Sequence, residues 1–375
     1  MKVPFLDLKP QHQSIKKEIF ARLDALYDQT EFAYGKTGKE FEMLFSAFNQ
    51  CRYAVALDNG TTAVELALRS AGIGQGDEVI TVSNTFIATV AAIHFTGATP
   101  VFCDIDAKTW NIDAAKIEEK ISTHTKAIIA VYLYGQPAEM LKIKKIAEKY
   151  HLVLIADCAQ SIGSQIFENG AWKPASCFAD IASFSFYAGK NMGACGEAGA
   201  IVTNNENYAA FASAFRDHGS AEKYIHKFPG RNHRIDAFQA AILSVKLKYI
   251  NTWNEMRQQV AGWYINELAG IKGLQLPHVA RDVKTVWHLF VVLVENRDDF
   301  QQYLAAKEIG TAFHYKIPVH LQQAFSYLGL KQGHLPVTEY VEQRNISLPM
   351  YPELTHDQIS YTCEVIREYF KTSKD

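Results

Sequence analysis

The sequence predicts an α/β protein with a large domain built on a mostly parallel β-sheet and a smaller α+β domain after it. Short apolar strands alternate with helical stretches through the first two-thirds of the chain. These strands are apolar along their whole length, which is typical of strands that helices cover on both faces. The chain of 375 residues also exceeds the ~250–300 residues beyond which one hydrophobic core usually divides.

The elements of the large domain follow one another in the order strand, helix, strand. The first strand, "RYAVAL" (52–57), leads into a helix at 61–72 that Gly72 closes. Helices are also predicted at 86–97 and 138–151. Apolar runs predict the remaining strands at 78–82, 100–105, 126–135, 152–157, 181–186 and 199–204.

The smaller domain begins after a long helical stretch. We predict that residues from Phe238 to Leu268 form one helix that bridges the two domains. Beyond it we expect strands at 285–294 and 310–315 and helices near 297–307 and 355–371. The predicted division is therefore a large domain over residues 1–249 and a small C-terminal domain over residues 250–375.

The composition argues against several classes of partner. A formal net charge of −2 gives no electrostatic reason to bind nucleic acid or an anionic membrane. No apolar run approaches the ~20 residues of a membrane span. The N-terminal "MKVPFLDLKPQHQ" lacks the apolar core of a signal peptide, so a cytoplasmic location is expected. The six cysteines show no metal-site spacing and no C-x-x-C motif, so we predict reduced thiols and no metal site.

One lysine stands in an unusual setting. In "ASFSFYAGKNMGACGEAGAIVTN", Lys190 is the only charged residue between Asp180 and Glu197, and it follows a predicted buried strand. An apolar setting lowers the pKa of a lysine and favours the neutral amine that attacks a carbonyl group. Lys190 is therefore a candidate nucleophile.

Two other motifs have plain structural explanations when each is taken alone. "NGTT" (59–62) lies between a strand and a helix, where free backbone N–H groups can bind phosphate, although it could be a simple helix N-cap. Asp157 ends a predicted buried strand, where a carboxylate faces the ligand crevice of a parallel sheet. An internal salt bridge or an N-cap would explain Asp157 equally well.

The order of the three motifs is more specific than any one of them. A phosphate-binding turn, a strand-end aspartate and a lysine in an apolar pocket fit pyridoxal 5′-phosphate (PLP). The aspartate would keep the pyridine nitrogen protonated, and the lysine would form the Schiff base. Other lysine chemistries stay open on this reasoning.

The chain resembles the DegT/DnrJ/EryC1/StrS family of PLP-dependent sugar aminotransferases, which have fold type I, the aspartate aminotransferase-like fold. The blocks that carry the resemblance span nearly the whole sequence: "VPFLDLKPQ" (3–11), "NGTTAVELAL" (59–68), "GDEVITVSNTFIAT" (76–89), "GATPVFCDID" (97–106), "DCAQSIGS" (157–164), "SFYAGKNMGACGEAGAIVTN" (185–204), "RNHRIDAFQAAIL" (231–243) and "LPMYPELT" (348–355). The resemblance implies fold, cofactor and activity together.

The resemblance assigns a role to individual positions. Lys190 matches the Schiff-base lysine, Asp157 the partner of the pyridine nitrogen, and Gln160 the residue that hydrogen-bonds the 3′-oxygen of the cofactor. Phe86 matches the aromatic residue that stacks on the ring. The phosphate contacts of the family match Gly60, Thr61 and Ser185. Asn232 matches an asparagine that reaches the cofactor phosphate of a second subunit. The residues on the sugar side match Tyr187, His314 and Tyr315.

The function that the resemblance implies is transfer of an amino group from glutamate to a nucleotide-linked keto-sugar by a homodimer. The stretch around Tyr187 and Gly189 favours amination at C3 of a dTDP-3-keto-6-deoxyhexose. The alternative is amination at C4 of a dTDP- or UDP-4-keto sugar.

Three positions depart from the family pattern, Tyr132, Ala188 and Ala198. A sugar dehydratase of the same family would have histidine in place of Lys190. A non-catalytic protein with this fold is the other alternative.

Overall fold

The centre of the molecule is a seven-stranded sheet with the strand order β1-β9-β8-β5-β4-β2-β3. The structure is a computed structural model and describes residues 1–372. Only β9 runs antiparallel to its neighbours β1 and β8, and the other pairs are parallel. The predicted α/β class with a mostly parallel sheet is thus confirmed. The strands are β1 (Tyr53–Leu57), β2 (Glu78–Val82), β3 (Thr99–Cys103), β4 (Thr125–Val131), β5 (Val153–Asp157), β8 (Ile181–Ser185) and β9 (Gly199–Thr203).

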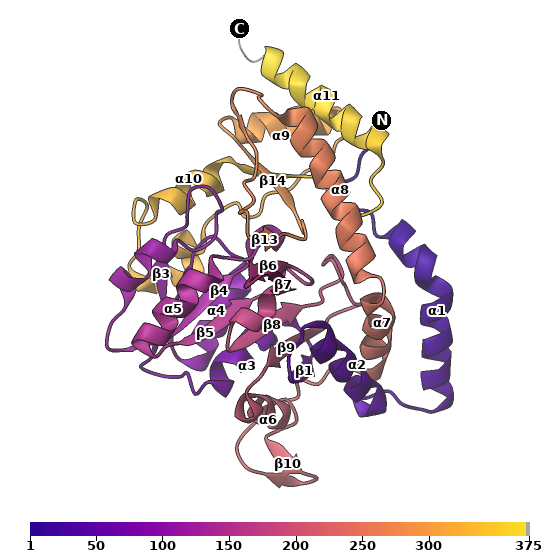
Figure 1. Cartoon of the computed structure of the whole chain (residues 1–375), viewed down its shortest axis with the longest axis vertical. Coiled ribbons are helices and arrows are strands. Elements are labelled where there is room, and N and C mark those ends of the chain that lie inside the picture. The colour runs from indigo at the N-terminus through magenta and orange to yellow at the C-terminus, as the bar shows by residue number, and fades with distance from the viewer. Residues whose placement is uncertain (373–375) are drawn as a thin grey trace.

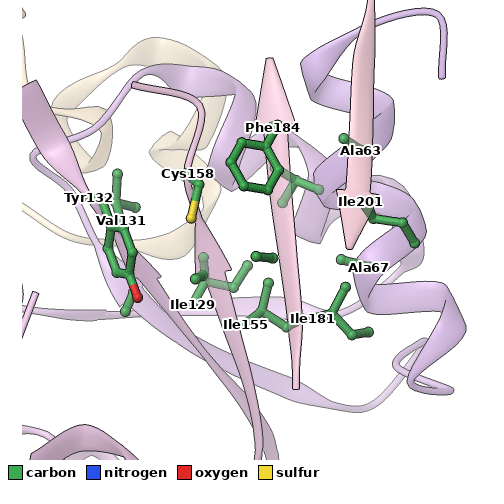
Figure 2. Packing of buried hydrophobic residues seen from close by; sticks show 14 of the residues in the cluster. Ala63, Ala67, Ile129, Val131, Tyr132, Ile155, Cys158, Ile181, Phe184 and Ile201 are labelled. Atoms are coloured by element: carbon green, nitrogen blue, oxygen red, sulfur yellow. The ribbon is translucent and has the colours of Figure 1, made fainter. Parts of the chain in front are cut away.

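Helices cover this sheet and share its core. Figure 2 shows Ala63 and Ala67 of α3 close to the apolar side chains of the central strands, which include Ile181 and Ile201. These small side chains let α3 pack closely against β8 and β9. The helices of this part are α1 (Lys9–Asp28), α2 (Gly35–Phe48), α3 (Gly60–Ser70), α4 (Ile87–Thr96), α5 (Met140–Tyr150), α6 (Glu206–Phe215) and α7 (Ala237–Leu247).

The strand predicted at 126–135 ends early, at Val131. The backbone N–H of Leu133 donates to Asn111 Oδ1, and that of Tyr134 donates to Gln160 Oε1, so neither bonds to a neighbouring strand. Tyr134 also has a φ of 60°, which turns the chain away from the sheet. The chain therefore forms a 3-10 turn, Leu133–Gly135, just beyond the carboxyl end of β4.

The helix predicted over 238–268 is in fact two helices, α7 and α8 (Ile250–Leu268). At the junction the N–H groups of Lys248 and Tyr249 bond three residues back, to Val245 and Lys246, which tightens the last turn of α7. Figure 1 shows α8 running from the part that holds the large sheet to the part that holds α9 and α11.

A second hydrophobic cluster lies around the C-terminal half of α8. Ile250 and Trp253 pack in the large core, whereas Tyr264 and Leu268 pack in the second cluster. The predicted boundary after residue 249 stays a prediction. The elements of this part are β12 (Leu274–Gln275), β14 (Phe290–Val294), α9 (Arg297–Ala306), α10 (Pro336–Arg344), β15 (Asn345–Leu348) and α11 (His356–Thr372).

Two strands predicted for this part are wrong, one in extent and one altogether. The one at 285–294 shortens to β14, because Trp287 has a φ of 47°. The one at 310–315 is not a strand, and it pairs only through a single bridge of Ala312 with Ser347. The remaining strands are β6 (Gln165–Glu168), β7 (Ala171–Pro174), β10 (Ser220–Glu222), β11 (Ile225–His226) and β13 (Val283–Lys284).

The first residues of the chain belong with the second cluster rather than with the sheet that follows them. Val3 is fully buried there and forms a bridge with Ile309. The chain then crosses to α1, which packs against α7. Over residues 1–372, no helix has the length and apolar character to span a membrane.

Candidate active site

The predicted site residues gather, with one exception, around a single cavity of about 720 Å³. The cavity lies at the carboxyl ends of β5 and β8, beside the first turns of α3 and α4. Its walls include all of the following: Gly60, Thr61, Phe86, Asp157, Gln160, Ser185, Tyr187, Lys190, His314 and Tyr315. The topology therefore brings together side chains that are far apart in sequence.

Lys190 reaches this cavity from the turn after β8. Its backbone N–H donates to the carbonyl of Tyr187 (2.8 Å), which closes the turn. Surrounding protein desolvates the ammonium group and lowers the pKa of Lys190 from 10.5 to about 8, although the negative charge of Asp157 opposes this shift. A large share of the amine is therefore neutral near pH 8 and able to attack a carbonyl group.

Asp157 is buried at the end of β5, with its carboxylate at the cavity wall. Its Oδ2 accepts a hydrogen bond from the Thr89 hydroxyl (2.7 Å), and its Oδ1 accepts one from the backbone N–H of Ala159 (3.1 Å). Burial nevertheless raises the pKa of Asp157, and these bonds and the charge of Lys190 only partly offset it. A cationic group in the cavity would stabilise the ionised form further.

The amide of Gln160 has a defined orientation. Its Oε1 accepts the backbone N–H of Tyr134 (2.7 Å), so its Nε2 must be on the other side, where it donates to the hydroxyl of Tyr315 (3.1 Å). Gln160 therefore presents an N–H donor to the cavity. This is the polarity that the predicted bond to the cofactor's 3′-oxygen requires.

A helix N-terminus forms the polar end of the cavity. Asn59 caps α3, and its Oδ1 accepts the N–H of Thr62 (2.8 Å). The N–H groups of Gly60 and Thr61 precede the first intrahelical bond, so they are available to an anion. A Cβ on Gly60 would lie 2.5 Å from the Cβ of Ser185, which shows how closely β8 approaches this turn. Glycine is therefore required at the start of α3.

Replacement of Gly60 with alanine should damage both folding and anion binding. The new Cβ would also lie 3.1 Å from the backbone Cα of Ser185, so β8 or α3 must shift. We expect the free energy of unfolding to fall by roughly 1–3 kcal/mol, the usual range for overpacking. Thermal denaturation of the cofactor-free protein and the binding constant for the cofactor measure the two effects.

Gly262, inside α8, is the matched control. An added Cβ there meets no atom within 4 Å, and an alanine in a helix interior should stabilise the protein by about 0.5–1 kcal/mol. If Gly60→Ala and Gly262→Ala changed the denaturation temperature equally, the close packing of Gly60 against Ser185 would be contradicted.

Aromatic residues form the opposite wall. The rings of Phe86 and Tyr315 have centroids 5.6 Å apart, and the ring of Phe5 stacks on His314 at 5.8 Å. His314 Nδ1 is 2.8 Å from the hydroxyl of Ser347, and burial lowers the pKa of His314 to about 4. His314 is therefore neutral at physiological pH.

Asn232 is the exception among the predicted residues. It is exposed, it forms a bridge with Asp217, and it does not line the cavity of its own chain. The predicted contact of Asn232 with a second subunit stays a prediction.

Three further residues at the cavity were not predicted from the sequence. Thr89 binds Asp157 as described above, from the first turn of α4. His288 Nδ1 lies 3.0 Å from Asn191 Oδ1, and burial holds the pKa of His288 well below 6.5. Arg257 donates from Nη1 to the carbonyls of Trp287, His288 and Met350 at 3.0, 3.2 and 3.0 Å. Of these three residues, only Thr89 lies in one of the sequence blocks that carry the family resemblance.

Known proteins resemble this chain over nearly its whole length. The sequence profile of the DegT/DnrJ/EryC1/StrS aminotransferase family matches residues 13–367. A protein of Aneurinibacillus thermoaerophilus named dTDP-3-amino-3,6-dideoxy-alpha-D-galactopyranose transaminase is 41% identical over 98% of this chain and 99% of its own. A protein of Geobacillus stearothermophilus named pleiotropic regulatory protein is 40% identical over 99% of both chains.

A solved structure shows the same fold. The crystal structure of NtdA from Bacillus subtilis, with the cofactor PMP bound, has a TM-score of 0.91 and 34% identity. It covers 99% of this chain and 85% of its own.

Proposed function

The chain belongs to the DegT/DnrJ/EryC1/StrS aminotransferase family, and from this we propose that it transfers an amino group from glutamate to a nucleotide-linked keto-6-deoxy sugar with PLP as cofactor. The observation that carries the proposal is the pairing of Lys190, whose pKa is lowered to about 8, with the buried carboxylate of Asp157 across one cavity. Amination of a nucleotide sugar follows from membership of the family. The identity of the amino donor and of the sugar is our proposal.

The residues around the cavity fit the cofactor. Lys190 would hold it covalently, Asp157 would bind its pyridine nitrogen, and the Nε2 of Gln160 would donate to its 3′-oxygen. Gly60, Thr61 and Ser185 would hold its phosphate, and Phe86 would face its ring. When bound, PLP supplies an electron sink for the carbon that loses or gains a proton.

The protein's own groups then manage charge and protons. Asp157 would remain ionised beside a protonated pyridine nitrogen, because that positive charge would offset the cost of burying the carboxylate. Lys190, as a neutral amine, would take a proton from the α-carbon of glutamate and would later give one to the sugar carbon. General base catalysis of this kind contributes ~10²–10⁴-fold. His314 stays neutral and can bind a sugar hydroxyl without competing for that proton.

We assign the amination to C3 of a dTDP-linked 3-keto-6-deoxyhexose. The A. thermoaerophilus relative is named for a dTDP-linked 3-amino sugar, which supports this choice. Tyr187, which is 55% exposed at the cavity, and Gly189 adjoin Lys190, where they can shape the space around the reacting carbonyl. The alternative is amination at C4 of a dTDP- or UDP-4-keto sugar.

A panel of matched 3-keto and 4-keto dTDP-6-deoxyhexoses, supplied with glutamate, tests the assignment. Lys190 delivers its proton from one place, and a displacement of 1 Å can cost ~10²-fold in rate. We therefore expect one regioisomer to dominate, with the amine on C3 as determined by NMR. Exclusive amination at C4 would overturn the regiochemistry and leave the aminotransferase activity standing.

The same panel separates amination from other roles. The G. stearothermophilus relative is named as a regulatory protein, so a non-catalytic role is the second candidate. Absence of amination with every sugar of the panel, together with absence of the glutamate half-reaction, which needs no sugar, would favour it.

We further propose a homodimer in which Asn232 of each chain contacts the cofactor phosphate of the other. The exposure of Asn232 supports this arrangement.

A further inference from the structure

Two cysteines from distant parts of the chain lie beside one backbone carbonyl group. Cys51 precedes β1, and Cys177 belongs to the short 3-10 helix Ala175–Phe178 that precedes β8. The Sγ atoms of Cys51 and Cys177 lie 3.4 Å and 2.8 Å from the carbonyl oxygen of Asn49. Each thiol also shifts the pKa of the other: Cys177 raises the pKa of Cys51, and Cys51 lowers the pKa of Cys177. Their sulfur atoms are therefore neighbours.

Both thiols are partly exposed, which distinguishes them from most other cysteines of the chain. Cys103, Cys158 and Cys363 are buried. Cys195 is exposed, but the partner of its Sγ is His12 Nδ1 at 3.8 Å rather than another thiol. A small thiol reagent can thus reach Cys51 and Cys177 together.

We propose that Cys51 and Cys177 are a reversible redox pair that a low-molecular-weight disulfide, such as glutathione disulfide, oxidises to an intramolecular disulfide. One cysteine, as the thiolate, attacks the oxidant and releases one molecule of reduced glutathione. The second cysteine then displaces the other glutathione from the mixed disulfide. Two protein thiols are oxidised, one glutathione disulfide is reduced, and two glutathione thiols carry away the protons.

The surroundings hold the two segments together in either state. The hydroxyl of Ser176 donates to Asn49 Oδ1 at 2.9 Å, and Asn49 is buried. This contact does not involve sulfur, so it keeps Cys177 near Cys51 after reduction. The pair can therefore close again without a search through the unfolded chain.

The same carbonyl group makes the disulfide reducible. Within residues 1–372, the two thiols are the hydrogen-bond donors of the Asn49 carbonyl oxygen. Oxidation removes both S–H protons and leaves a buried acceptor without a partner, which disfavours the oxidised state. A pair of this kind responds to the surrounding thiol pool, whereas a permanent structural disulfide does not.

Incubation of the purified full-length protein in a series of glutathione buffers tests the proposal. After alkylation of the remaining thiols, we expect a single two-electron transition in intact mass and a Cys51–Cys177 cross-link in the peptide map. Because the disulfide closes a long loop, the oxidised protein should denature at a temperature higher by roughly 5 °C.

Single substitutions locate the effect. Cys51→Ser and Cys177→Ser retain a hydrogen-bond donor for Asn49 and should each abolish the cross-link and the shift in denaturation temperature. Cys195→Ser should leave both unchanged. A cross-link that involves Cys158, or a glutathione adduct without any internal disulfide, would overturn the proposal. Amination activity is not a readout here, so the result is independent of the proposed function.

Discussion

Lys190→Ala is expected to lower the rate of amination by at least ~10⁴-fold, because one residue supplies both the covalent attachment of the cofactor and the moving proton. Alanine also removes a desolvated cation from the cavity, so the fold itself should tolerate the change. The glutamate half-reaction, followed by the absorbance of the cofactor, measures the loss without any need for the sugar.

Chemical labelling gives a readout that does not depend on turnover. Borohydride should attach the cofactor of the wild-type protein irreversibly to one peptide, the one that contains Lys190. In the cofactor-free protein, the reaction of Lys190 with an amine reagent should rise with pH through a midpoint near 8, where its pKa lies. Desolvation favours the neutral form, so this midpoint lies below that of an exposed lysine.

Lys246 serves as an internal control for the borohydride labelling. It is also buried, and desolvation lowers the pKa of Lys246 to about 8 as well, but it does not line the cavity. Attachment of the cofactor to Lys246 would show that a lowered pKa alone selects the lysine. The assignment of Lys190 would then be wrong.

Asp157→Asn should produce the second-largest loss, at least ~10²-fold in the glutamate half-reaction. A hydrogen bond to a charged group contributes about 1.5–3 kcal/mol, which corresponds to roughly 10–150-fold, and loss of the protonated pyridine nitrogen adds to this. The amide is similar in shape, and its one oxygen can still accept from the backbone N–H of Ala159 while its NH2 group donates to the hydroxyl oxygen of Thr89, so part of the cofactor should remain bound.

Asp180→Asn is the matched control for Asp157→Asn. Asp180 accepts the backbone N–H of Leu154 (2.8 Å) near the other end of β5 and does not line the cavity. The activity of the Asp180→Asn variant should stay within about twofold of that of the wild type. If Asp157→Asn kept near-normal activity as well, Asp157 would have a structural role only.

The sequence was informative where a local pattern has a single structural meaning. The apolar strands 152–157 and 181–186 could be placed within a residue because turns bound them, and their carboxyl ends then located Asp157 and Lys190. No such local pattern indicates whether a strand runs parallel or antiparallel to its neighbours. Gly199 begins β9, the antiparallel strand, at a point where a Cβ would lie 2.3 Å from the carbonyl oxygen of Asn59.

Other features depend on partners that are remote in the sequence. The turn at Tyr134 has a positive φ without glycine, and the side chain of Gln160 holds it. His288 lies in the apolar stretch "TVWHLFVVLV", where nothing local distinguishes a cavity residue from a core residue. The role of Asn232 depends on a second chain. Family resemblance could supply Gln160 and Phe86, but composition and periodicity could not.

The N-terminal residues have a practical consequence for anyone who produces this protein. Phe5 and Leu6 line the cavity, Phe5 stacks on His314, and Met1 is 57% exposed just before them. An affinity tag fused to Met1 would therefore be attached only a few residues from the cavity wall and could obstruct a bulky nucleotide-linked molecule. A tag that follows α11 begins from a helix packed on α8, so kinetic constants should be compared on C-terminally tagged or tag-free protein.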